Sequence, residues 1–372
     1  MKRKVVHVSA VILVLIAALA IIAWLTLITL LPVDQYAKLP KVLAAPPSTG
    51  QQLAPYQGPH PRLWHRPADP FPYPIQRGQV GPSTPLYAIP PQYPFACGGE
   101  RSGLGSPLID NSERWGIRVS TPSDPAQAGY SKDCLHPTQA WYLYNRQGTR
   151  HFYPIDEANG DIAQISINGQ SIDFIIRVEM GTINRFIYTL AALKGPNDTL
   201  DTPDGEYWNR HLIYQFRGGV GIGYRQGRTA PDAIPERRFE QLKLGYAVAY
   251  STANQTSNHY DIWLAEDTAL RVKRQFSALY GRPVATIGVG GSGGAIQQYL
   301  IGQNGSDLLD GALALYAYPD MLSQTLYAFD CELLEYYFDV SADSNRWRHW
   351  QQRRLIEGLN SREYAADSRT YI

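Results

Sequence analysis

Short apolar runs alternate with amphipathic stretches through the second half of the chain. Three such runs, at His211–Phe216, Gly245–Tyr250 and Gly311–Tyr316, have the almost continuous apolar character of buried strands. Residues 262–280 instead repeat apolar positions every three or four residues, which predicts an amphipathic helix. This alternation predicts an α/β fold, with a mostly parallel sheet covered by helices on both faces.

The flanking sequence gives weaker signals. An Asn168–Gly169 pair between β-forming runs at 161–167 and 172–182 predicts a hairpin. Residues 183–193 fit either a strand or a short helix. After Asp320, aromatic and charged helix-forming residues dominate, which predicts the start of a helical lid rather than further strands.

The amino terminus has the pattern of a membrane anchor. Lys2, Arg3 and Lys4 precede a run, Val5–Leu31, that contains no acidic residue, lysine or arginine. A signal-peptide core spans about 7–15 residues, whereas a bilayer-spanning helix needs about 20. We therefore expect an uncleaved signal anchor, a cytoplasmic basic tip and an extracytoplasmic remainder, in the periplasm or at the cell surface. Cleavage near Ala44 is the alternative.

Proline content divides the next part of the chain. About half of the 27 prolines lie between Pro46 and Pro94, which excludes regular helix and central strand there. The predicted organisation is a basic tip (1–4), a signal anchor (5–32), a Pro-rich stalk or surface wrap (33–92), an α/β core (93–320) and an incomplete helical lid segment (321–372).

Charge and cysteine content exclude several function classes. The 34 basic and 33 acidic residues form no charged block, so we expect no nucleic-acid partner. No CxxC or HExxH motif occurs, so we expect neither a metal nor another cofactor. In an oxidising compartment Cys97 and Cys134 are the natural disulfide pair, because both precede the core, and this leaves Cys331 without an obvious partner.

The strongest chemical signal is a serine between glycines. The strand-like run 284–289 stops at Gly290–Gly294, whose sequence Gly-Gly-Ser-Gly-Gly fits the G-x-S-x-G turn. That turn raises a nucleophilic serine between a strand and a helix, and helical sequence follows at 295–301. Ser292 is therefore the predicted nucleophile. The backbone N–H of Gly293 is the first predicted oxyanion donor, and Gly218 or Gly219, after the 211–216 strand, supplies the second.

The same glycines allow other interpretations. Gly288, Gly290 and Gly293 also match the dinucleotide-binding pattern G-x-G-x-x-G, which would make the protein an NAD(P)-dependent oxidoreductase. That pattern needs an acid at the end of the next strand, but Asp310 comes before that strand and Asp320 well after it. The other alternative is that the turn has no chemical role. The protein would then be a non-catalytic, anchored binding module on a hydrolase scaffold.

Several segments together resemble a known family. Residues 177–188, 208–219, 290–294 and 310–320 occur in the order found in a tannase/feruloyl-esterase-like group of secreted α/β-hydrolases, and the likeness covers roughly 91–338. Arg217 departs from it, since a third glycine is more usual there. The resemblance implies a serine esterase that hydrolyses small or oligomeric esters of aromatic acids or hydroxyacids.

The catalytic acid and base are not evident. In α/β-hydrolases they follow the serine, and the single downstream histidine, His349, lies in a basic helical sequence. Asp320 and Asp330 are the candidate acids, and the sequence does not favour one over the other. Because no late strands are predicted to carry them, we expect these 372 residues to be an incomplete hydrolase, inactive alone, with the partner of Cys331 beyond its end.

Overall fold

The computed structural model describes residues 16–23, 65–110, 116–121, 124–221, 224–320, 330, 333–334, 336–342 and 345–357. The chain divides into two compact units. One comprises Gln57–Pro319, and the other combines Met1–Tyr56 with Asp320–Ile372.

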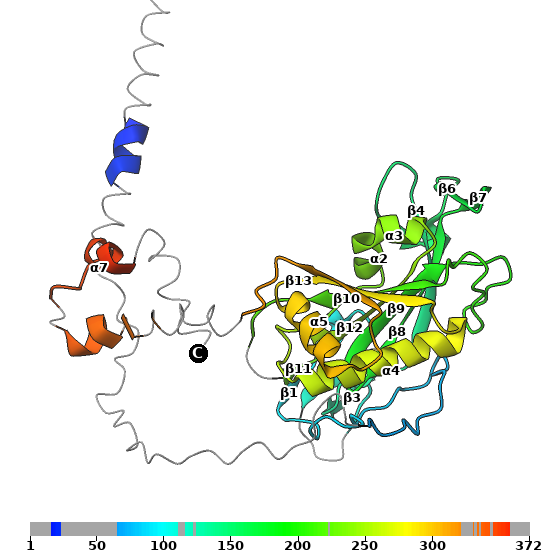
Figure 1. The fold of residues 1–372 in the computed structure, drawn as a ribbon, viewed down its shortest axis with the longest axis horizontal. Coiled ribbons are helices and arrows are strands. Elements are labelled where there is room, and N and C mark those ends of the chain that lie inside the picture. The colour runs from blue at the N-terminus through cyan, green and yellow to red at the C-terminus, as the bar shows by residue number, and fades with distance from the viewer. Residues whose placement is uncertain are drawn as a thin grey trace, which may run out of the picture. The chain divides into compact units, whose positions relative to one another are not determined.

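The Gln57–Pro319 unit is built on one eight-stranded sheet with the order β14-β13-β10-β12-β9-β8-β4-β5 (Figure 1). Its strands are β4 (Gln139–Asn145), β5 (Phe152–Pro154), β8 (Ile175–Ile183), β9 (Phe186–Leu193), β10 (His211–Arg217), β12 (Ala247–Gln255), β13 (Ala285–Gly291) and β14 (Gly311–Leu315). The strands β14, β13, β10 and β12 are parallel to one another, while β9, β8, β4 and β5 add on in antiparallel pairs. The sheet is therefore mixed, and the prediction of a mostly parallel sheet was wrong.

A tight turn explains this difference. The strands β8 and β9 are joined by Asn184 and Arg185, which have φ values of 52° and 73°. Two consecutive residues with positive φ form the two-residue turn that suits a hairpin, so the two strands must run antiparallel. Of the two alternatives left open for residues 183–193, the strand is correct.

Short strand pairs surround the main sheet. They are β1 (Phe95–Ala96) with β11 (Tyr224–Arg225), β2 (Ile117–Thr121) with β3 (Asp124–Ser131), and β6 (Gln164–Ile167) with β7 (Gln170–Asp173). The β6–β7 pair confirms the hairpin predicted at Asn168–Gly169, although its second strand ends at Asp173 and the chain then enters the main sheet as β8. Two 3-10 turns, η1 (Gly99–Ser102) and η2 (Ile155–Glu157), complete this part.

Helices cover both faces of the sheet, as predicted. The helices are α2 (Ala233–Arg237), α3 (Phe239–Lys243), α4 (Ile262–Tyr280) and α5 (Gly293–Asn304). Alternate residues of the central strands point to opposite faces. Ile213 and Val248 join the core cluster that contains residues of α2 and α3. Their neighbours Leu212 and Ala249 join the cluster that contains α4 and α5.

The described part of the Pro-rich stretch runs along α4. The guanidinium of Arg66 contacts Glu266 at 2.6 Å, and Asp69 accepts a 3.0 Å hydrogen bond from Arg271. Further along, the backbone N–H of Ile75 donates to the side chain of Gln275 at 2.7 Å. Residues from 65 onward in this stretch therefore wrap over the surface of the sheet unit.

A disulfide closes the amino-terminal side of this unit. Cys97 and Cys134 are bonded, which confirms the predicted pair. Cys331 lies outside the described residues.

The other unit contains the predicted anchor and lid. Of Val5–Leu31 the structure describes residues 16–23, which are helical, and the rest of the run lies outside the described residues. In the portions of the chain that the structure describes, no helix has both the length and the apolar character needed to cross a membrane. After Asp320 the described elements are the π-helical turn η3 (Tyr337–Ser341) and the helix α7 (Trp350–Glu357).

Candidate active site

Ser292 occupies the turn between β13 and α5, in the strand–serine–helix order that the sequence predicted. Its φ of 56° and ψ of −128° put a non-glycine residue in a sparsely populated backbone region, at a cost of order 1–3 kcal/mol. Hydrogen bonds on both sides hold this conformation. The N–H of Ser292 donates to the carbonyl of Leu315 at 3.3 Å, and its carbonyl accepts from Ala295 N–H at 2.8 Å.

The glycines beside Ser292 are required by close packing. A Cβ on Gly290 would lie 2.7 Å from the carbonyl oxygen of Phe216, and one on Gly293 would lie 2.1 Å from Oγ1 of Thr256. Both distances are below ordinary van der Waals contact, so no larger residue fits without movement. The turn is therefore pressed against the end of β10 and the segment after β12.

Two glutamines on α5 hydrogen-bond the serine turn and the segments beside it, and neither was predicted from the sequence. Nε2 of Gln297 donates to the carbonyls of Arg217 and Asn254 at 3.2 and 3.3 Å. Nε2 of Gln298 donates to the carbonyls of Gly290 and Gly294 at 3.2 and 2.9 Å. The available signal was a pair of adjacent amides within the apolar first half of the helix.

The loop after β10 approaches the nucleophile closely. A Cβ on Gly218 would lie 2.9 Å from both the backbone nitrogen of Gly293 and the Cβ of Ser292. Gly219 follows with a φ of 118°, and its carbonyl accepts from Thr256 Oγ1 at 2.6 Å. Since Gly293 is the first residue of α5, its N–H has no acceptor within the helix. The predicted oxyanion residues thus converge on one side of Ser292.

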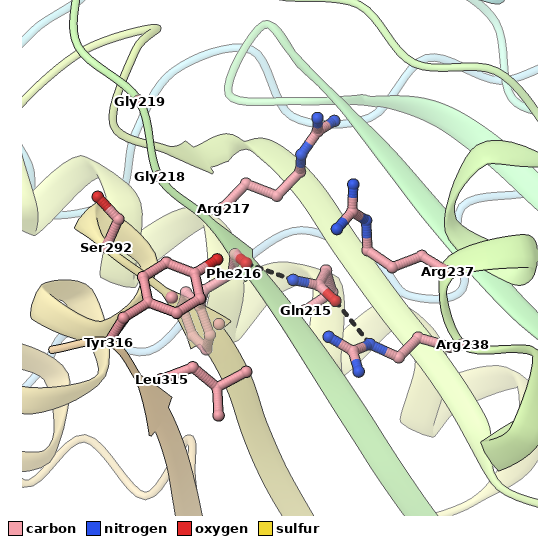
Figure 2. Close-up of a pocket in the computed structure, with 12 residues that line it drawn as sticks. Gln215, Phe216, Arg217, Gly218, Gly219, Arg237, Arg238, Ser292, Leu315 and Tyr316 are labelled. Atoms are coloured by element: carbon pink, nitrogen blue, oxygen red, sulfur yellow. Dashed lines mark hydrogen bonds between the residues drawn. The ribbon is translucent and has the colours of Figure 1, made fainter.

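Ser292 lines a pocket of about 330 Å³ (Figure 2). This volume is at the lower end of the range for small-molecule sites, about 300–1,000 Å³. The lining residues come from β10, β13, β14, the end of α2 with the residue after it, and the loops that follow the strands: Gln215, Phe216, Arg217, Gly218, Gly219, Arg237, Arg238, Gly290, Gly291, Ser292, Leu315 and Tyr316.

Three arginines give this pocket its charge. Nε of Arg238 donates to Oε1 of the buried Gln215 at 2.6 Å. Burial lowers the pKa of Arg238, and the neighbouring charge of Arg237 lowers it further. Burial raises the pKa of Tyr250 to about 12, and the guanidinium of Arg217 acts against this rise. The departure noted at Arg217 therefore places a cation, instead of a third glycine, in the lining of this pocket.

Two tyrosines after β14 also approach the turn. A Cβ on Gly291 would lie 2.0 Å from Cζ of Tyr316, so this ring covers the backbone next to Ser292. The hydroxyl of Tyr318 lies 3.4 Å from Oγ of Ser292. Among the described residues, Ser292 Oγ has no hydrogen bond to a histidine or a carboxylate.

The candidate acids and base fall in the other unit. Asp320, Asp330 and His349 all belong to the unit that contains Asp320–Ile372, so their catalytic roles stay predictions. His259, in the sheet unit, is buried between the rings of Phe186 and Tyr224 and accepts from the N–H of Asp261 at 3.2 Å. Burial lowers the pKa of His259 to about 4, which suits a structural residue.

Comparison with protein families shows which family this chain belongs to. A model described as a tannase-like family of unknown function (DUF6351) matches residues 81–371. The chain belongs to this tannase-like family. The matched region contains Ser292, the β10 loop and all three pocket arginines, and it confirms the resemblance drawn from the sequence. A comparison with curated proteins finds no match.

Solved structures similar to this tannase-like protein include several esterases. Esterase 2 of Thermogutta terrifontis shares 13% identity over 40% of this chain and 61% of its own, with a TM-score of 0.25. A carboxylesterase of Geobacillus stearothermophilus shares 12% identity over 49% and 38%, with a TM-score of 0.23. An esterase of Clostridium hathewayi shares 12% over 68% and 56%, with a TM-score of 0.24. The chain spans less than two thirds of the length of each of these proteins.

Proposed function

We propose that this tannase-like protein is a carboxylic-ester hydrolase whose nucleophile is Ser292. The observation that carries the proposal is the backbone of Ser292, held at φ 56° and ψ −128° where β13 meets α5, with Gly218 against it and a pocket in front. A strained serine at a strand–helix turn is the arrangement that exposes Oγ to a bound ester. Membership of a tannase-like family supports the same chemistry.

The proposed reaction has two steps. Oγ of Ser292 attacks the ester carbonyl carbon, and the oxyanion that forms faces the N–H of Gly293 and the Gly218–Gly219 loop. The bond from the carbonyl carbon to the alcohol oxygen then breaks, and water hydrolyses the acyl-serine to release the acid. A base must accept the proton of Ser292 and pass it to the departing alcohol. Within these 372 residues the single histidine after Ser292 is His349, and Asp320 and Asp330 are the candidate acids.

Location and substrate class are proposed on separate grounds. The uncharged run behind Lys2–Lys4 supports membrane anchoring with the sheet unit outside the cytoplasm. The disulfide between Cys97 and Cys134 supports an oxidising compartment. Esters of aromatic acids or of hydroxyacid oligomers are the proposed substrates. Resistance of the sheet unit to protease added outside the membrane that carries the anchor, in cells whose outer envelope has been removed, would contradict the proposed location.

The direct test of activity is substitution of Ser292 in a form of the protein that includes its catalytic base. We expect Ser292→Ala to lower the turnover of p-nitrophenyl acetate by about 1,000-fold or more, because the loss of a nucleophile removes most of the catalysis. Ser277→Ala, on α4 and outside the pocket lining, is the matched control and should retain the parent rate. Equal rates for Ser292→Ala and the parent would refute the proposal. Tight NAD(P)H binding without hydrolysis would instead favour the oxidoreductase alternative.

A further inference from the structure

Positive charge is concentrated in the pocket that holds Ser292. Three of its twelve lining residues are Arg217, Arg237 and Arg238, and none is an aspartate or a glutamate. The chain as a whole is nearly neutral, with 34 basic and 33 acidic residues. The concentration is therefore a local feature and does not follow from a basic composition.

The three guanidinium groups lack acidic partners among the described residues. Arg238 is oriented by Gln215, a 3% exposed residue whose Nε2 is itself bound to the carbonyls of Phe216 and Val289. Arg217 lies beside the Tyr250 hydroxyl. None of the three forms an ion pair with an aspartate or glutamate of the described residues. Arginines elsewhere in the sheet unit do, as Arg66 does with Glu266.

The three positive charges have no acidic side chain to balance them, and an anionic ligand would supply that charge. Like charges in a partly buried pocket repel, and the lowered pKa of Arg238 has burial as its main cause and the charge of Arg237 as the next. A guanidinium binds a carboxylate through two parallel hydrogen bonds, and such charge-assisted bonds are stronger than neutral ones. Figure 2 shows Ser292 at one side of the pocket and Arg237 and Arg238 at the other. An anion bound by the arginines would therefore sit beside, rather than on, the nucleophile.

We infer that the ester substrate carries a free carboxylate, which Arg217, Arg237 and Arg238 bind while Ser292 attacks the neighbouring ester. This inference rests on the proposed function and narrows its substrate class to esters with an acidic end, such as linear hydroxyacid oligomers, over uncharged aromatic esters. The carboxylate is unchanged by the reaction, since only the ester bond is cleaved. The small pocket suits a short unit between the ester and the acid.

Equilibrium binding tests this without requiring turnover. On the Ser292→Ala background, the linear dimer lactoyl-lactate is compared with its carboxamide by calorimetry. The two ligands differ only in the terminal charge. We expect the acid to bind about tenfold more tightly than the amide, and added salt to reduce the difference. Equal affinity of acid and amide would overturn the inference. A preference for inorganic phosphate over the acid would also overturn it, because it would indicate a phosphate site.

Paired variants assign the effect to the pocket. The double variant Arg217→Gln with Arg237→Gln should lower the ratio of acid affinity to amide affinity about tenfold, because the charge-assisted hydrogen bonds are lost. Arg210→Gln with Arg282→Gln changes the net charge equally at exposed positions outside the pocket lining and should leave the preference intact. Equal loss in both pairs would overturn the site assignment. Acid-selective binding with no Ser292-dependent hydrolysis would contradict the proposed function while leaving the carboxylate site standing.

Discussion

The backbone at the nucleophile is crowded from several sides at once. Ser292 has a φ of 56°. A Cβ added to Gly293 would meet the side chain of Thr256, and one added to Gly218 would lie 2.9 Å from both Ser292 Cβ and the backbone nitrogen of Gly293. The sequence revealed the serine turn, because G-x-S-x-G is a local pattern. It did not reveal Arg237 and Arg238, which are distant in sequence from Ser292 and join the pocket because α2 packs on the sheet face that carries Ile213 and Val248.

Gly218→Ala tests the oxyanion loop. The added Cβ would lie 2.9 Å from Ser292 Cβ and 3.0 Å from the carbonyl of Gly291, so either the loop or the nucleophile must move. Loss of one oxyanion donor costs about 100-fold or more in kcat. We expect a decrease of that size in ester hydrolysis, with the folded state retained by circular dichroism.

Gly302→Ala is the matched control for this substitution. Gly302 lies inside α5, and a Cβ there would meet nothing within 4 Å. Alanine favours helix by about 1 kcal/mol over glycine, so this variant should be equally or more stable and fully active. Equal activity of Gly218→Ala and Gly302→Ala would remove Gly218 from the oxyanion site.

Individual elements were predicted best where side-chain periodicity and a cap agree. The helix α4 has the predicted bounds, Ile262–Tyr280, because its apolar repeat is long and Asp261 caps its first turn. Strand direction was predicted poorly. A strand such as β8, which is buried along almost its whole length, can belong to a parallel or an antiparallel sheet, and the turn at Asn184–Arg185 sets its direction.

Asp261→Ala tests the contribution of that cap. The side chain of Asp261 accepts from the N–H of Leu264 at 3.1 Å, and loss of an N-cap acceptor costs about 1 kcal/mol. We expect the free energy of unfolding in urea to decrease by that amount. Asp261→Asn keeps an acceptor and should retain most of the stability. An alanine variant as stable as the parent would show that the cap contributes nothing.

At the scale of the whole molecule, the sheet unit buries two histidines in neutral form. Burial lowers the pKa of His136 and of His259 to about 4 in each case. Neither ring nitrogen of His136 has a hydrogen-bond partner among the described residues. Sequence alone could not show this, because a single histidine in a mixed segment carries no burial signal.

Stability should therefore fall in mild acid. Between pH 6.5 and about 4 the unfolded chain binds a proton at each of these histidines and the folded chain does not. The unfolded state then holds more protons, so the free energy of unfolding decreases as pH falls, by up to about 1.4 kcal/mol per pH unit for each histidine. The full contribution is present above pH 6.5. Urea denaturation at a series of pH values measures it.

His136→Phe isolates one of the two groups. A phenyl ring fills a similar volume and cannot bind a proton, so we expect a weaker pH dependence between pH 6.5 and 4 than in the parent. His65→Phe replaces an exposed histidine and should leave the slope unchanged. A steep slope that persists in His136→Phe and in a matching His259→Phe variant would assign the acid sensitivity to other groups.

The central claim, that Ser292 is an activated nucleophile, is tested most directly by covalent labelling. The protein, in a form that includes its catalytic base, is incubated with a fluorophosphonate and digested, and the modified residue is identified by mass spectrometry. The account predicts one phosphonyl adduct on Ser292, formed by displacement of fluoride by Oγ and absent from Ser292→Ala. A folded protein that remains unlabelled, or that carries the adduct on another residue, would contradict it.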